Sequence, residues 1–152
     1  MGVIMKFSKK SRYGLRALID LAVNSKNEHV SLCSIAERNH ISPQYLEQVF
    51  ASLRRAGIVK SIKGPQGGYL LNYPPEKITV ADILKILEGT YHIEDEEVFE
   101  EDQVQGISIA IQKLVVDQVN QELDRILGNV TLADLEDDYL DYCNYEQGMY
   151  YI

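Results

Sequence analysis

The segment that follows Ser42-Pro43 carries polar side chains at a spacing suited to reading another molecule. Gln44, Glu47 and Gln48 recur at the i, i+3, i+4 spacing of one helical face, and Arg55 continues that face. A Gln side chain presents a donor beside an acceptor, which matches the N6/N7 edge of adenine, and a Glu carboxylate accepts from the N4 amine of cytosine. The spacing therefore favours a helix that reads base edges in a major groove over a merely solvated helix face.

Two further groups of residues suit contacts with a nucleic-acid backbone. Lys63 is followed by the turn Gly64-Pro65-Gln66-Gly67-Gly68, and glycine allows a close approach because it lacks Cβ. We expect this turn to reach the backbone or the minor groove. Lys9, Lys10, Ser11, Arg12 and Tyr13 are expected to precede the first helix, where they suit phosphate contacts that orient without specifying sequence.

The sequence shows no residue pattern typical of catalysis or of metal binding. The sequence contains no Ser/His/Asp set, phosphate-binding loop or paired-carboxylate pattern, which argues against an enzyme. Cys33 and Cys143 lie far apart and show no metal-ligand spacing, so we expect no metal site. Cys33 lies beside the expected DNA-reading unit, and a redox role for it stays open. The alternative, a small residue at the edge of a helix, is favoured because no neighbouring Lys or Arg would lower its pKa.

The elements that must position these residues can be read from the apolar periodicity. Residues 11–25 place apolar side chains on one helical face, and a second helix begins at Ser31, its N-cap. The third helix starts at Ser42-Pro43 and stops at Ala56-Gly57. Residues 58–62 and 69–72 read as two strands joined by the glycine-rich turn. The order predicts a mainly α fold with a small β wing, a winged helix-turn-helix over residues 5–90.

The second half of the chain predicts an arm. Residues 78–83 begin a helix with a cap, an acidic third position and a hydrophobic staple, and residues 130–135 repeat this pattern. Residues 91–103 form an acidic linker, residues 104–145 contain dimerisation helices, and residues 146–152 form a C-terminal tail. A long helix over 104–127 carries a broad apolar stripe that needs a covering partner, for which we favour a second copy of the chain over the chain's own domain. The expected dimer residues are Ile107, Ile111, Leu114, Val115, Val119, Leu123 and Ile126.

The charge is divided between the two halves. Residues 1–90 hold 13 Lys/Arg and 7 Asp/Glu, a net +6, whereas residues 91–152 hold 2 and 16, a net −14, within a chain of net charge −8. Such asymmetry suggests a nucleic-acid module joined to a different unit. Screening over ~8 Å at physiological salt keeps a distant acidic arm from cancelling a basic face. No membrane-spanning run and no secretory segment occur, so we expect a cytoplasmic protein without a membrane partner.

Three runs of sequence resemble the Rrf2 family of bacterial regulators: 41–48 (ISPQYLEQ), 53–59 (LRRAGIV) and 63–69 (KGPQGGY), with 11–15 and 83–89 matching its opening and its post-wing helix. The resemblance implies a winged-helix homodimer on double-stranded DNA with a partly palindromic operator. It implies base contacts by Gln44, Glu47 and Gln48 and a DNA contact by Lys63. The full set expected at DNA is Lys10, Ser11, Arg12, Tyr13, Gln44, Tyr45, Glu47, Gln48, Arg54, Arg55, Lys63, Gly64, Pro65 and Gly67.

This sequence differs from many members of the family in the segment that holds their iron–sulphur cluster. Many members hold an iron–sulphur cluster through three cysteines between the post-wing helix and the dimer helix. Residues 90–106 contain no cysteine, and His92 alone cannot replace the thiolates that a cluster needs. We therefore expect no cofactor.

The acidic segment and the last residues, 146–152 (EQGMYYI), resemble the cysteine-metabolism repressors of that family. The resemblance implies association with cysteine synthase when O-acetylserine is scarce. Tyr150, Tyr151 and Ile152 would then form a docking peptide whose α-carboxylate mimics an amino-acid substrate; the alternative is a tail that packs on the dimer core. We expect a repressor of sulphur or cysteine metabolism. A redox sensor using Cys33 and a winged helix that binds protein remain as alternatives.

Overall fold

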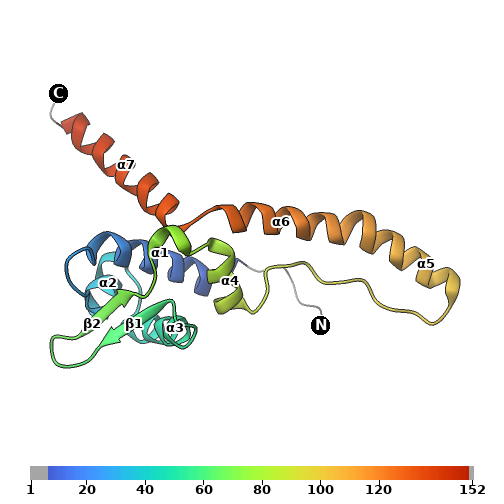
Figure 1. Cartoon of the computed structure of the whole chain (residues 1–152), viewed down its shortest axis with the longest axis horizontal. Helices are drawn as coiled ribbons and strands as arrows, with labels where there is room; N and C mark the ends of the chain where they lie inside the picture. Colours follow the sequence, from blue (N-terminus) through green and yellow to red (C-terminus); the bar gives the residue numbers. More distant parts are fainter. Residues whose placement is uncertain (1–6, 151–152) are drawn as a thin grey trace.

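The computed structural model describes the chain from Phe7 to Tyr150, with side chains described as far as Gly148. Figure 1 shows a compact unit at the N-terminal side from which two helical arms extend. The compact unit comprises α1 (Lys9–Asn24), α2 (Leu32–Asn39), α3 (Pro43–Arg55), β1 (Val59–Ile62), β2 (Gly68–Leu71), a 3-10 turn η1 (Pro75–Lys77) and α4 (Val80–Glu88). The arms are a long helix, made of α5 (Asp102–Ile111), a π-helical turn η2 (Gln112–Val116) and α6 (Asp117–Asn129), and α7 (Leu132–Tyr150). The predicted winged helix-turn-helix with a small β wing is confirmed.

Local capping sets the bounds of the second and third helices. The Ser31 hydroxyl accepts from the backbone N–H of Ser34 at 3.2 Å, and the Ser42 hydroxyl accepts from Tyr45 at 3.4 Å. Gly57 ends the third helix with φ of +83°, a left-handed conformation that glycine adopts without a Cβ clash. These are the caps and the stop predicted from the sequence, and they are confirmed.

The predicted start of the first helix is wrong. Lys9 to Tyr13 do not precede α1 but form its first turns, because the hydroxyl of Ser8 caps the helix by accepting from the Ser11 N–H. A capping residue directly before the basic pair Lys9-Lys10 moves the helix start to Lys9. The basic side chains therefore project from a helix rather than from a loop.

The core fills the space between α1, α2, α3 and the wing. Its largest fully buried side chains include Leu18, Leu21, Ile35, Leu46 and Phe50. Phe50 stacks on Tyr69 of β2 with ring centroids 4.8 Å apart. This contact fixes the wing against α3, because stacked aromatic side chains gain energy beyond the area that they bury.

The wing is a two-stranded antiparallel ribbon with an additional backbone anchor. Val59 pairs with Leu71 and Ile62 with Gly68. Outside the ribbon, Val30 in the loop before α2 exchanges two backbone hydrogen bonds with Tyr69, of 3.0 and 2.8 Å. The wing is thus held from the α1–α2 loop as well as by its own pairing.

The two repeated capping patterns lie against each other. Thr79 and Thr131 both cap their helices while Asp82 and Asp134 bond back to the cap N–H groups. Thr79 and Thr131 also form an isolated antiparallel bridge, in which Val80 N–H donates to the Val130 carbonyl at 2.9 Å. The starts of α4 and α7 are therefore joined, and α7 leaves the compact unit from this point (Figure 1).

The acidic segment between α4 and α5 runs without helix or strand from residue 90 to 101. Its first part, residues 91–97, is here called the strap because side chains of the long helix hold it. Asn120 accepts from the Ile93 N–H at 2.8 Å, and the Gln112 amide oxygen accepts from the Glu96 N–H at 2.8 Å. The strap is therefore tethered along the helix that follows it.

Candidate nucleic-acid interface

The polar face of α3 is exposed on the side opposite the core. Gln44, Glu47 and Gln48 are exposed, whereas Leu46 and Val49 between them are buried. Among residues 7–150, no hydrogen bond or ion pair engages the side chains of these three polar residues. Their donors and acceptors are therefore unoccupied and directed to solvent, as a base-reading helix requires.

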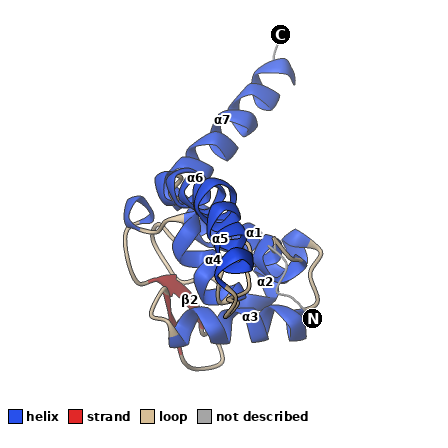
Figure 2. Cartoon of the chain, turned by 90° about the vertical axis from the view of Figure 1, so that its right-hand side faces the viewer, coloured by secondary structure: helices blue, strands red, loops and turns tan. Residues whose placement is uncertain are grey.

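The helix α3, here called the recognition helix because it carries the expected base-reading residues, lies with the wing at one end of the molecule. Figure 2 shows α3 and β2 together at the lower end, with α7 extending from the opposite side. Arg54 and Arg55 are exposed at the end of α3, and Lys60 and Lys63 are exposed on the wing. This grouping places four cations beside the polar face and leaves the acidic α7 pointing away from it.

The wing turn depends on glycine for its shape. The Gly67 N–H donates to the Gly64 carbonyl at 2.9 Å, and Gly64 has φ of +116°. A Cβ built on Gly67 would lie 2.2 Å from the carbonyl oxygen of Ile62. Lys63, Gly64 and Pro65 are exposed at the tip, so this backbone is held in a tight form that projects outward.

The start of α1 contacts the start of α3 through two tyrosines. Tyr13 and Tyr45, both half-buried, meet edge to face with centroids 5.6 Å apart. Arg12 is exposed, and its Nε donates to the Phe7 carbonyl at 3.1 Å. Lys10 is half-buried on the same turns. Tyr13 of α1 therefore contacts Tyr45 of α3, and Arg12 lies exposed on the same turn of α1 as Tyr13.

Ser11 is placed differently from the other expected DNA contacts. It is 0% exposed, and its hydroxyl donates to Glu88 Oε1 at 2.6 Å. The Ser8 backbone N–H donates to the same oxygen at 3.2 Å. Ser11 therefore joins α1 to the end of α4 and does not present its hydroxyl to a phosphate.

The apolar stripe of the long helix is exposed over its outer part. Ile107 is 59% and Leu114 is 70% exposed. Ile111, Val115, Val119 and Ile126 are also exposed. Leu123 differs, because it is half-buried and packs with Leu127 against a cluster on α4. The inner end of the helix therefore rests on the compact unit, while the rest of the stripe lies open.

The sensor region does not offer the donors of a thiolate-held cluster. Cys33 is exposed and Cys143 is half-buried, and both are outside residues 90–106. His92 Nε2 lies 2.7 Å from Asp124 Oδ1. Between Phe7 and Gly148, no group of three His, Cys, Asp or Glu side chains is placed to hold a metal ion. These residues do not fit an iron–sulphur cluster.

An ionisable pair fixes the start of the strap to the long helix. Tyr91, 2% exposed, donates to Asp124 Oδ1 at 2.5 Å. Burial and this bond raise the pKa of Tyr91 to about 12. The bonds from Tyr91 and His92 lower the pKa of the Asp124 carboxyl, because they favour its charged form.

Two further expectations concern the termini and the membrane. Tyr151 and Ile152 of the expected docking peptide, and the side chain of Tyr150, lie outside the described residues; α7 itself runs to Tyr150. Of the helices that the structure describes, none has the length and apolar character needed to cross a bilayer.

Comparison with known proteins gives one consistent family. Residues 7–138 match the family model Rrf2, described as an iron-dependent transcriptional regulator. The chain is 42% identical over 131 residues to the HTH-type transcriptional regulator CymR of Bacillus subtilis, covering 86% of this chain and 89% of the relative. It is 50% identical over 88 residues to the HTH-type transcriptional regulator IscR of Cereibacter sphaeroides, covering 57% of each.

A solved structure agrees with the sequence relatives. The structure of CymR, the global cysteine regulator of B. subtilis, superposes with a TM-score of 0.71 at 38% identity, covering 88% of this chain and 98% of that chain. The resemblance drawn from the sequence, to this family and within it to a cysteine-metabolism regulator, is confirmed.

Proposed function

Since this chain belongs to the Rrf2 family of DNA-binding transcriptional regulators, we propose that it represses genes of sulphur or cysteine metabolism as a homodimer. The observation that carries the proposal is the exposed, unengaged face of Gln44, Glu47 and Gln48 beside the wing. The likeness to CymR, a cysteine regulator in another bacterium, supports the choice of regulated genes.

The polar face of α3 contacts the bases, whereas the end of α3 and the wing contact the phosphates. The two glutamines pair with adenine edges and Glu47 accepts from cytosine, so these three side chains specify the sequence. Arg54, Arg55 and Lys63 neutralise phosphates and set the register of the protein on the duplex. Arg12 and Tyr13 add backbone contacts from α1, and Tyr45 holds Tyr13 in place.

Dimerisation through the long helix covers its open apolar stripe. Ile107, Leu114 and Val115 are more than half exposed in the single chain, and their burial against a second copy removes this apolar surface from water. A two-fold axis through the paired helices presents two α3 helices to the DNA. A partly palindromic operator then matches the symmetry of the protein.

The regulator works without an iron–sulphur cluster. Cluster sites use cysteine thiolates, and residues 90–106 supply none. In their place, Asp124, Asn120 and Gln112 hold the strap by hydrogen bonds from the long helix. The signal therefore enters by another route.

For that route we propose docking of the C-terminal peptide on cysteine synthase. In Figure 2, α7 points away from the α3 face, so a partner bound beyond α7 does not compete for space at the base-reading residues; the proposed docking peptide is Tyr150, Tyr151 and Ile152. A terminal carboxylate beside an apolar side chain suits a pocket that binds an amino-acid substrate.

Salt dependence of binding to the protein's own promoter region tests the proposal. A reader that neutralises several phosphates loses affinity log-linearly as salt rises, with a slope of about −0.9 for each phosphate. Lys63→Ala should make this slope shallower by about one unit. Lys77→Ala, a lysine of η1 outside the expected contact set, is the control. Absence of binding to the promoter region at low salt would overturn the regulator proposal.

A pull-down with cysteine synthase tests the signal. The full chain should retain the synthase, O-acetylserine should release it, and a chain lacking Tyr151-Ile152 should not bind it. Sedimentation of the truncated chain provides the control for dimer assembly. If the truncated dimer still binds the synthase, the docking peptide lies elsewhere.

A further inference from the structure

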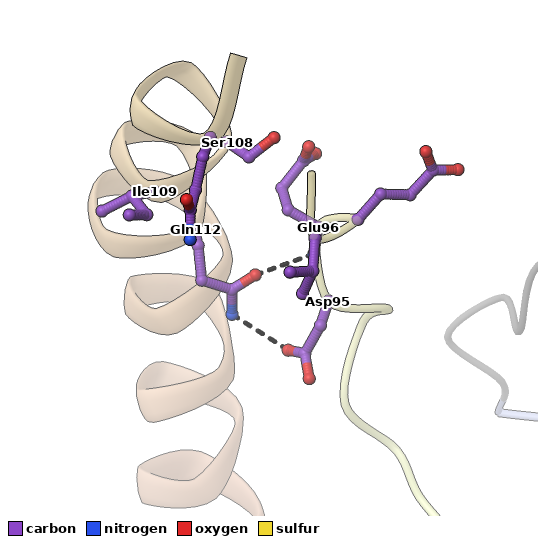
Figure 3. Close-up of a pocket in the computed structure, with 8 residues that line it drawn as sticks. Asp95, Glu96, Ser108, Ile109 and Gln112 are labelled. Carbon is purple, nitrogen blue, oxygen red and sulfur yellow. Dashed lines mark hydrogen bonds between the residues drawn. The ribbon is translucent and has the colours of Figure 1, made fainter. Parts of the chain in front are cut away.

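A cavity of about 340 Å³ lies between the strap and the outer part of the long helix. Figure 3 shows its two walls, with the strap on one side and α5 on the other. The strap contributes Asp95, Glu96 and Glu97, and the helix contributes Ser108, Ile109 and Gln112. The site is therefore formed by two segments that only the fold brings together.

Ser108 is the polar group that points to a ligand. It is 7% exposed, and in Figure 3 its hydroxyl is directed from the helix toward the strap. No hydrogen bond of the described chain engages this hydroxyl. Since the described chain has no fully enclosed side-chain N or O atom without a partner, Ser108 Oγ remains accessible from the cavity. A largely buried hydroxyl without a protein partner is placed to bond a bound molecule.

The cavity is acidic and its amide group is already occupied. The Gln112 Nε2 donates to Asp95 Oδ1 at 2.9 Å while its Oε1 accepts from the Glu96 N–H, as the dashed lines in Figure 3 show. No Lys or Arg lines the cavity. The negative charge of the strap is therefore not neutralised by a cation of the lining.

We propose that this cavity binds a small organic cation, an alkyl ammonium or diammonium compound. Its ammonium group lies between the strap carboxylates and donates to Ser108 Oγ, and its alkyl part packs on Ile109. A metal ion fits less well, because the described carboxylates do not converge in a group of three that could hold one. An amino acid fits less well too, because the strap would repel its own carboxylate.

Such a ligand joins the strap to α5 at Ser108 and Gln112, which directly follow Ile107 and Ile111 of the open apolar stripe in the sequence. Ligand binding thus gives the dimer helix an input that needs neither cluster nor thiol. The binding itself does not depend on the proposed regulatory function; only this coupling to the dimer rests on it.

Calorimetric titration of the full chain with 1,4-diaminobutane and with butylamine tests the proposal. We expect saturable binding of one molecule per chain, at least about tenfold weaker in Glu96→Gln/Glu97→Gln and several-fold weaker in Ser108→Ala. The control Asp137→Asn/Asp138→Asn removes the same two charges from the exposed surface of α7 and should bind like the original chain. Amide exchange supplies a second readout, because the Glu96 N–H should become more protected with ligand.

Three results would overturn the proposal. The first is an absence of saturable binding. The second is equal weakening in both double variants, which indicates diffuse attraction to the acidic arm. The third is displacement of the amine by a lower concentration of Mg²⁺, which indicates a metal site. DNA binding measured on the same samples keeps these outcomes separate from failure of the regulatory function.

Discussion

Ser11 Oγ donates a hydrogen bond of 2.6 Å to Glu88 Oε1, so the last residue of α4 holds the first turn of α1. The two residues are 77 positions apart, and Ser11 is fully buried. The bond places the basic start of α1 relative to the helix that leads into the arm.

Replacing Glu88 by Ala should therefore destabilise the fold. The buried Ser11 hydroxyl and the Ser8 N–H both lose their acceptor, which costs about 1–3 kcal/mol. The free energy of unfolding, measured in urea, checks this. Glu28→Ala, an exposed glutamate in the loop before α2, is the control and should change stability by less than about 0.5 kcal/mol. Equal midpoints for the two variants would contradict the role of Glu88.

Gly67→Ala should impair the wing. Its Cβ would meet the Ile62 carbonyl at 2.2 Å, so the turn must open and Lys63 must move. We expect at least about a tenfold loss of DNA affinity, equivalent to 1.4 kcal/mol, by fluorescence anisotropy. Gly128→Ala in α6 meets nothing within 4 Å and should bind normally. Unchanged affinity of the Gly67 variant would exclude the wing from the interface.

Gln44→Ala/Gln48→Ala should remove sequence preference without removing DNA binding. Each bidentate base contact contributes about 1–3 kcal/mol of discrimination, whereas the phosphate contacts remain. Competition between operator and unrelated DNA measures this preference. Gln147→Ala, on the exposed surface of α7, leaves it intact. A variant that still prefers the operator would mean that another element reads the bases.

Leu114→Glu should dissociate the dimer. Leu114 is 70% exposed in the single chain, and a carboxylate buried without a partner in the interface is strongly unfavourable. Sedimentation should show a shift from dimer to monomer at micromolar concentration. Asn27→Glu adds the same charge in an exposed loop and should sediment as a dimer. A dimeric Leu114 variant would move the interface elsewhere.

Tyr91 should ionise late in an alkaline titration. Its pKa is raised from 10.0 to about 12, so the stability that it contributes is full below pH 10 and is lost as pH rises toward 12. The difference in tyrosinate absorbance between the original chain and Tyr91→Phe should therefore appear near the upper end of this range. A difference that titrates at the ordinary value would contradict burial of Tyr91.

The hydrogen bond between Tyr91 and Asp124 also makes stability depend on pH in the acid range. Because the pKa of Asp124 is lowered, its contribution to stability is present above the ordinary value of 3.8 and is lost as pH falls below it. In Tyr91→Phe this acid sensitivity should become smaller, because the first cause of the shift is removed.

Short-range signals in the sequence were sufficient to predict the helices and the exposed polar face of the DNA-reading unit. Ser42-Pro43 starts α3 and Gly57 ends it, and the exposed face of Gln44, Glu47 and Gln48 follows from helical spacing alone. Caps, stops and periodicity act within a few residues, which is why they could be predicted.

Long-range contacts could not be read in this way. Ser11 was expected at a phosphate because its acceptor, Glu88, is distant in sequence. The strap was expected only as part of an acidic linker over residues 91–103, yet Asn120 holds it across 27 positions. One signal was present: Gln112 and Asn120 are amides among the apolar residues of a long helix, and such groups need partners when they are buried. Their partners in the strap emerge only from the fold.

The bridge between Thr79 and Thr131 fixes the base of α7 to the start of α4. Two backbone hydrogen bonds and the buried Leu132 join the base of α7 to the start of α4. One turn further along α7, Glu136 Oε1 forms an ion pair with Lys26 Nζ at 2.6 Å. The base of α7 and the start of α4 therefore form one connected unit, and the far end of α4 holds α1 through Glu88. Tilting of α7 would have to carry with it the start of α4 and the α6 residues Leu123 and Leu127 that pack on α4.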